Sequence, residues 1–152
     1  MEKDIVPWLQ NKLWDILLSN QVDKKTFINT LLSRGIKGEL SSFNTLNGIL
    51  FSDISIQQLI EEEYRHDSIE ATEESHRNLS TFSSGERKKA FLKYCLKKNP
   101  DYIILDNPFD HLDQTSRKQL ADSLEQLSES LGFIQLVNRT EDLLSFIENK
   151  AQ

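Results

Sequence analysis

The hydrophobic positions of this chain fall into two patterns that alternate along it. Short continuous apolar runs, each bounded by polar or turn-forming residues, predict buried strands at 14–19, 48–52, 102–106 and 133–137. A run such as YIILD, at 102–106, is apolar at successive positions, as expected for a central parallel strand that is covered on both faces. These four segments predict the centre of a sheet.

Between the runs, apolar residues recur every three or four positions, which predicts amphipathic helices. The helices are expected over 24–32, 55–64, 84–98, 114–131 and 140–150. Arg34-Gly35 and Asn99-Pro100 are expected to end the first and third, and Asp113 and Gly132 to cap and end the fourth. Residues 65–78 are polar without a period and predict a surface loop. Strands alternating with helices indicate one mainly parallel, three-layer α/β domain over residues 1–152.

Composition narrows the classes of function. A net charge of -6 and a pI near 5.1 argue against direct binding to nucleic acid, which needs a basic face. The single cysteine, Cys95, indicates a reducing, cytoplasmic setting, and no apolar run is long enough for direct insertion into a membrane. The three histidines, His66, His76 and His111, lack the spacing of zinc ligands. Any association with a membrane is therefore expected through a partner.

Two further segments carry the chemistry. Residues 79–89, LSTFSSGERKK, open a helix with serine and glycine, whose unpaired N–H groups and hydroxyls suit a phosphate. Residues 102–113, YIILDNPFDHLD, place Asp106 at the carboxyl end of a buried strand, where it can hold Mg²⁺ through water. In this order and spacing, the two segments resemble the signature motif and the Walker B strand with D-loop of ABC (ATP-binding cassette) ATPases. The resemblance implies a P-loop NTPase fold, shortened at the N-terminus, with ATP and Mg²⁺ as cofactors.

The resemblance also implies individual roles. The five signature places are taken, in order, by Phe82, Ser83, Ser84, Gly85 and Glu86. In the family these residues face an ATP that the opposite subunit holds; the alternative is a plain helix cap with an acid in the first turn. Asp106 takes the place of the Walker B aspartate and Asp113 that of the D-loop aspartate. For Asp106, the alternative is a turn residue that ends the strand before Pro108.

No intact P-loop motif precedes these segments. Residues 18–27, LSNQVDKKTF, can nevertheless be aligned with the family's GPNGSGKSTL. Candidate phosphate contacts in this alignment are Lys24, Lys25 and Thr26, while Leu18, Gln21 and Asp23 stand at glycine positions. Side chains there obstruct the approach of backbone N–H groups to phosphates, and the carboxylate of Asp23 would repel them. The alternative is that Asp23 caps an ordinary helix and the lysines are solvated.

The catalytic positions depart from the family as well. Asn107 stands where the family has a glutamate that activates water, and Asn138 where it has a switch histidine. The amide of Asn107 cannot accept the proton that the glutamate would take, and Asn138 cannot replace a histidine that contacts the γ-phosphate with a chargeable imidazole. At the expected Q-loop glutamine stand Ser52 and Asp53, with Gln57 as a displaced candidate.

The sequence therefore predicts an ABC-type domain that binds or regulates rather than hydrolyses ATP alone. Its predicted partner is a second ABC domain, in a homodimer or heterodimer, to which transporters of the family add a membrane subunit. Two alternatives stay open: a weak ATPase that uses Lys24, Thr26 and Asp106, and a protein-interaction module without nucleotide. Trp8 and Trp14 are candidates for stacking on adenine, although tryptophan at either position is more often part of a core.

Overall fold

One five-stranded parallel sheet forms the centre of the molecule. The computed structural model describes residues 12–19, 23–66 and 81–151. The strands are β1 Leu13–Leu17, β2 Gly48–Phe51, β3 Tyr102–Asp106, β4 Gly132–Val137 and β5 Asn149–Ala151. Their order is β2-β3-β4-β1-β5, and each neighbouring pair runs parallel. The four strands expected from the apolar runs are thus confirmed, and a fifth joins the edge next to β1.

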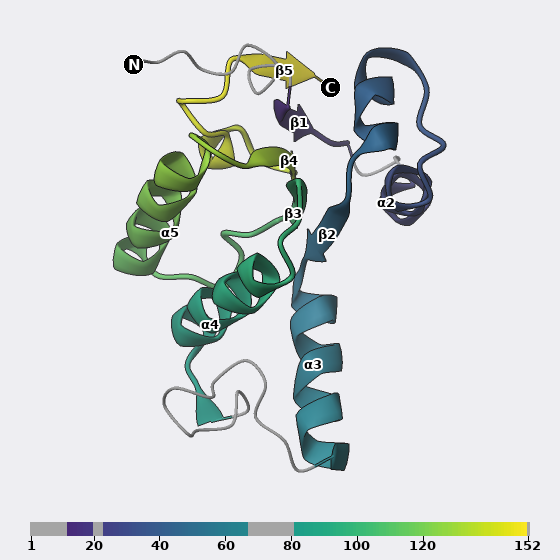
Figure 1. The fold of residues 1–152 in the computed structure, drawn as a ribbon. Helices are drawn as coiled ribbons and strands as arrows, with labels where there is room; N and C mark the ends of the chain where they lie inside the picture. The colour runs from purple at the N-terminus through teal and green to yellow at the C-terminus, as the bar shows by residue number, and fades with distance from the viewer. Residues whose placement is uncertain (1–11, 20–22, 67–80, 152) are drawn as a thin grey trace.

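Helices cover both faces of this sheet (Figure 1). They are α2 Lys24–Leu32, α3 Asp53–His66, α4 Ser84–Lys97 and α5 Gln114–Leu127, with 3-10 helices η1 Gly38–Thr45 and η3 Thr140–Asp142. Ile103 and Leu105 point to one face and pack under α4 and α5, whereas Ile104 points to the other and packs under α2 and η1. Because successive strand residues face opposite sides, a continuous apolar run serves two cores at once. The expected three-layer α/β fold is confirmed.

The end of α2 differs in detail from the expected glycine cap. Arg34 takes the left-handed conformation, with φ 65°, and Gly35 follows it. The N–H of Gly35 donates to the carbonyl of Thr30 at 3.0 Å and that of Arg34 to Leu31 at 3.1 Å, which together make a Schellman motif. The left-handed position thus falls one residue earlier than the glycine.

Gly132 was expected to end the helix before it, but it is instead the first residue of β4. The preceding helix α5 stops at Leu127, and Leu131 is buried beyond its end. A Cβ at Gly132 would lie 2.8 Å from Cβ of Lys12 and 2.9 Å from its carbonyl oxygen. This glycine is therefore required for the close approach of two chain segments, rather than for a helix cap.

The predicted closing helix over 140–150 is wrong. The segment makes one 3-10 turn, η3, and then the edge strand β5 beside β1. Asp15, fully buried on β1, accepts hydrogen bonds from the backbone N–H of Leu144 at 2.7 Å and from Nζ of Lys150 at 2.8 Å. Backbone hydrogen-bonding groups that would bond to one another within a helix thus bond instead to distant residues. The unpaired edge of β1 pairs with the end of this segment, which therefore forms a strand.

Helix α3 continues to His66, two residues into the predicted surface loop. The rest of that loop, with His76, lies outside the described residues, as do Trp8 and Gln21. Trp14 lies on β1 and packs beside the core under α2. In the part of the chain that the structure describes, no helix has the length and apolar character needed to cross a bilayer.

Candidate functional site

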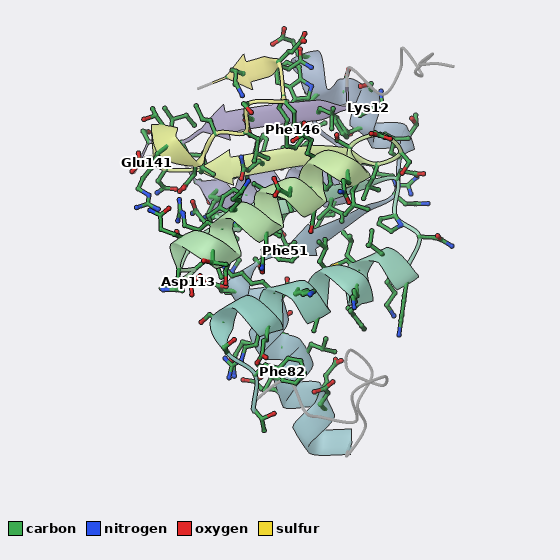
Figure 2. All side chains as sticks on the ribbon, turned by 90° about the vertical axis from the view of Figure 1, so that its left-hand side faces the viewer. Lys12, Phe51, Phe82, Asp113, Glu141 and Phe146 are labelled. Carbon is green, nitrogen blue, oxygen red and sulfur yellow. The ribbon has the colours of Figure 1, made fainter. Side chains whose placement is uncertain are left out.

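The candidate site lies at the edge of the sheet where the parallel strands end. Figure 2 shows Asp113 and Glu141 on the side of the molecule toward which the strands point. At this edge the structure brings together Lys24, Asp106, Asn107 and Asn138, from the start of α2 and the ends of β3 and β4. The carboxyl edge of a parallel sheet is where such folds bind ligands.

Lys24 and Asp106 form an ion pair across this edge. Nζ of Lys24 lies 2.7 Å from Oδ1 of Asp106, and the two side chains are 34% and 15% exposed. The same oxygen is buried and accepts no hydrogen bond of good geometry from the described residues. The ammonium therefore stands against the carboxylate that would hold Mg²⁺, and the arrangement does not fit the metal while this pair exists. In the described part of the chain, no three His, Cys, Asp or Glu side chains gather as a metal-binding group.

Asp23 caps α2 with its own side chain. Its carboxylate accepts a hydrogen bond from the backbone N–H of Thr26 at 3.1 Å and another from the Thr26 hydroxyl at 2.7 Å. These bonds, the hydroxyl's first, lower the pKa of Asp23. The helix start and the Thr26 hydroxyl are thus already engaged with an anion from the same chain, while the Lys25 side chain is exposed.

Two amides link the ends of β3 and β4. Nδ2 of Asn107 donates to Oδ1 of Asn138 at 3.1 Å. The backbone of Asn107 is left-handed, with φ 45°, and its N–H donates to the carbonyl of Leu136 at 2.8 Å. The pair is complementary as donor and acceptor, but neither amide can take up a proton near neutral pH.

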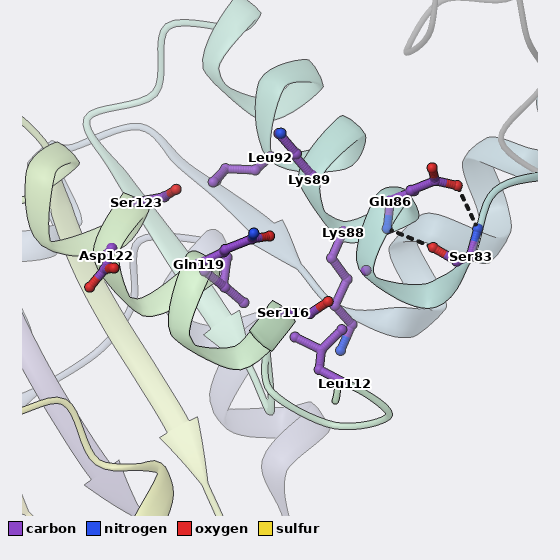
Figure 3. Close-up of a pocket in the computed structure, with 12 residues that line it drawn as sticks. Ser83, Glu86, Lys88, Lys89, Leu92, Leu112, Ser116, Gln119, Asp122 and Ser123 are labelled. Atoms are coloured by element: carbon purple, nitrogen blue, oxygen red, sulfur yellow. Dashed lines mark hydrogen bonds between the residues drawn. The ribbon is translucent and has the colours of Figure 1, made fainter. Parts of the chain in front are cut away.

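The signature segment, the five places at residues 82–86, lies at the start of α4, where Ser83 and Glu86 form a capping box (Figure 3). The N–H of Glu86 donates to Oγ of Ser83 at 3.2 Å, and the N–H of Ser83 donates to Oε1 of Glu86 at 3.1 Å. Ser83 and Ser84 are exposed. A Cβ at Gly85 would lie 2.6 Å from Oγ of Ser116, so this glycine lets α4 approach α5 closely. Beyond that contact the helices line a groove of about 440 Å³.

Asp113 caps α5, as expected, by accepting the N–H of Ser116 at 2.7 Å, and this bond lowers its pKa. At the predicted Q-loop position, Ser52 helps to cap α3, because its Oγ accepts a hydrogen bond from the N–H of Ser55 at 3.0 Å where the helix begins. Gln57 is exposed on α3, beside a hollow that Asp53 and His111 also line.

Sequence reasoning missed two buried or half-buried cations at the site, Lys88 and Arg117. Lys88 is 4% exposed, and burial lowers the pKa of its ammonium against the opposing effect of Asp53. Its position in the sequence carried a usable signal. Lys88 precedes Phe91, Leu92 and Cys95 at spacings of three, four and seven, which places it on the apolar face of its helix.

Cys95 is packed in the core under α4, as expected, and burial raises its pKa to about 12. At pH 8 about one thiol in ten thousand is then ionised, so the native protein should react with Ellman's reagent only as fast as it unfolds. The rate of colour formation in buffer and in urea measures this. A stoichiometric reaction within seconds in buffer would contradict the burial of Cys95.

Comparisons with known proteins show which proteins this chain is similar to. No family model matches the chain. The ABC transporter ATP-binding protein ModF of Escherichia coli K12 is 38% identical over 73 residues, which are 47% of this chain and 15% of ModF. The zinc uptake system ATP-binding protein ZurA of Listeria innocua is 26% identical over 120 residues, 79% of this chain and 43% of ZurA. The chain thus spans less than half the length of either relative.

Solved structures show the same fold. A chain described as a metal-chelate type ABC transporter, in an inward-facing conformation, superposes with a TM-score of 0.63 at 14% identity, covering 92% of this chain and 67% of that one. The protein cbiO1 of Clostridium perfringens, part of the ABC transporter complex cbiONQ, gives 0.54 at 16% identity, covering 85% and 68%. The homologues of this chain are therefore ABC transporter ATP-binding proteins, and its fold is that of an ABC-type P-loop ATPase domain.

Proposed function

We propose that this chain is an ABC-type domain that leaves its own nucleotide site empty of Mg-ATP and contributes its signature segment to ATP held by a second ABC domain. The observation that carries the proposal is the contrast between the two halves of the site. Lys24 and Asp23, at the aligned P-loop, are engaged with groups of the same chain. Ser83, in the signature segment, is bonded within the chain to Glu86, but only through a helix cap that leaves the start of this 14-residue helix exposed.

The state of the aligned P-loop supports the first half of the proposal. An incoming triphosphate would have to displace the carboxylate of Asp23 from Thr26 and draw the ammonium of Lys24 away from Asp106. Both contacts are short, and both already join opposite charges or strong hydrogen-bonding groups. The phosphates would also be repelled by the negative charges of Asp23 and Asp106.

The start of α4 supports the second half. Unpaired N–H groups at a helix start attract anions, and the hydroxyl of Ser83 stands beside them. In the nucleotide-bound pair, the capping box of Ser83 and Glu86 would supply the shape of this surface, and the phosphates of the partner's ATP would lie against it. The partner is accordingly a second ATP-binding domain with a complete P-loop. A second partner would be the membrane subunit of a transporter. The chain would act in the cytoplasm and would reach the membrane through that subunit.

Two forms of the chain test the proposal. A P-loop copy carries three substitutions that restore the aligned glycines and one that blocks its own signature: L18G, Q21G, D23G and S83R. The signature copy is the unchanged chain. Sedimentation velocity of an equimolar mixture should show a 1:1 complex in Mg-ATP and none without nucleotide. In the signature copy, Ser83→Arg should abolish this complex, because a bulky cation fills the space for the phosphate.

A control separates the surface from the fold. Loss of the Ser83 cap alone should cost about 1 kcal/mol of stability, so thermal unfolding of the variant should change only slightly. Ser130→Arg places the same side chain at an exposed position after α5 and should leave the complex intact. If the P-loop copy binds ATP and yet no complex forms, the role in trans is wrong and the interaction module without nucleotide gains. If the P-loop copy binds no ATP, the alignment of residues 18–27 is wrong.

Hydrolysis gives a separate prediction. The isolated chain should release phosphate from Mg-ATP at the background rate, because the amides of Asn107 and Asn138 cannot act as acid or base. The double variant N107E/N138H should stay at background too, since Asp23 and the Lys24–Asp106 pair still oppose nucleotide binding. A steady-state phosphate-release assay measures both. Clear activity of the parent that Asp106→Asn removes would show an intact ATPase.

A further inference from the structure

Three successive backbone carbonyls after β3 are all held by cations from the following and preceding helices. Nζ of Lys88 donates to the carbonyl of Pro108 at 2.8 Å and to that of Asp110 at 2.6 Å. Between them, Nη1 of Arg117 donates to the carbonyl of Phe109 at 3.0 Å. The backbone between β3 and α5 is therefore held by hydrogen bonds from a lysine on α4 and an arginine on α5.

Lys88 reaches this backbone from inside the signature helix. It lies just after the signature segment, and its ammonium is also 3.5 Å from Oδ1 of Asp53, where α3 begins. A lysine that is 4% exposed carries a desolvation cost that an apolar side chain of similar size would avoid. The two carbonyls and one carboxylate around it indicate that this charge fixes the relative positions of α3, α4 and the 107–113 segment.

Arg117 extends the same grip to the segment after β4. Its Nη2 contacts Oδ1 of Asp142, a side chain that is 2% exposed, and Arg139 donates to the other oxygen, Oδ2, at 3.2 Å. Arg139 directly follows Asn138, which is hydrogen-bonded back to Asn107. Charged hydrogen bonds thus join the signature helix and α5 to the carbonyls of residues 108–110 and to Asp142, and a neutral bond between two amides joins Asn107 to the position of the family's switch histidine.

We propose that Lys88 and Arg117 are positioning residues that hold the 107–113 segment in one conformation in the absence of nucleotide. Because the carbonyl grip involves only groups of this chain, it needs no bound phosphate or metal to form. This positioning role rests on the proposed function in one respect. A domain that binds no ATP of its own must present an already assembled surface to the ATP of its partner. The signature segment and Asp113 then form one rigid surface that faces the partner domain.

Hydrogen exchange on the full isolated chain tests the grip itself, without a partner. In the parent, the hydrogen-bonded amides of Asn107 and Asp110 in this segment should exchange slowly, and Mg-ATP should leave their rates unchanged. Lys88→Met removes both carbonyl contacts and should speed exchange in this segment at least tenfold while β3 and β4 exchange as before. Lys93→Met removes the same charge from an exposed position on the same helix and should behave as the parent.

A second variant guards against misfolding of the first. Arg117→Lys keeps the charge, but a single ammonium cannot serve the carbonyl of Phe109 and the carboxylate of Asp142 as the planar guanidinium does. It too should speed exchange at 107–113, by a smaller factor than Lys88→Met. Unchanged exchange in both variants would overturn the proposal, and so would exchange in the parent that slows only when Mg-ATP is added.

The consequence for assembly is measured separately. With the P-loop copy and Mg-ATP, Lys88→Met should weaken the complex at least tenfold at a temperature where the variant is fully folded, and Lys93→Met should not. Faster exchange with undiminished assembly would overturn the positioning role. If the parent itself does not assemble with a P-loop copy that binds ATP, the proposed function is refuted, while the exchange rates still decide whether Lys88 and Arg117 hold the segment.

Discussion

A roughly 10- to 100-fold gain in affinity for ATP is expected when Asp23 is replaced by glycine. The substitution removes a carboxylate that would face the phosphates, frees the N–H and hydroxyl of Thr26, and restores the backbone freedom that a P-loop needs at this position. Equilibrium binding of ATP to the isolated chain, followed by calorimetry in Mg²⁺, measures the change. The parent is expected to bind only in the millimolar range or more weakly.

Two matched variants separate the causes of that gain. Asp23→Asn keeps a good helix cap but removes the charge, so it should recover part of the gain. Adding Lys24→Met to Asp23→Gly should remove the gain, because Lys24 carries the ammonium that stands at the lysine position of the aligned P-loop. An unchanged affinity in Asp23→Gly would mean that Lys24 does not reach the phosphates and that residues 18–27 are not a P-loop relic.

The largest loss of stability is expected from Asp15→Ala, about 3–5 kcal/mol in the free energy of unfolding. Asp15 is fully buried, and its carboxylate accepts from Nε2 of Gln135 at 2.6 Å as well as from the backbone of Leu144 and from Lys150. Alanine would leave the first two donors buried without this acceptor. Urea denaturation followed by circular dichroism gives the difference.

Asp122→Ala is the matched control for this loss. Its carboxylate is exposed on α5 and pairs with Lys118 at 3.5 Å, an i,i+4 contact on the helix surface. Removing it should change the free energy of unfolding by no more than about 0.5 kcal/mol. A loss below about 1 kcal/mol in Asp15→Ala would show that the C-terminal segment does not depend on the buried carboxylate.

Local signals in the sequence were sufficient for most of the elements. The continuous apolar run at 102–106 predicted β3 without error, because a strand buried on both faces has no polar position to obscure it. The helix over 24–32 was predicted to the residue, and the alternative in which Asp23 caps it describes the hydrogen bonds that the structure contains. Helix caps and buried apolar runs depend on residues that are close together in the chain, so they can be predicted from the sequence alone.

Only the tertiary structure decided the features that depend on distant segments. The end of the chain became the strand β5 because the open edge of β1 and the buried Asp15 offered partners from the far end of the sequence. The pairing of Lys24 with Asp106 likewise depends on the order and register of the strands that carry them. By itself, the sequence determined that residues 18–27 contain no glycine and that residues 107 and 138 are both asparagines. It could not determine that the ammonium of Lys24 pairs with Asp106, because this contact follows from which helix start and which strand end the folded sheet brings to one edge.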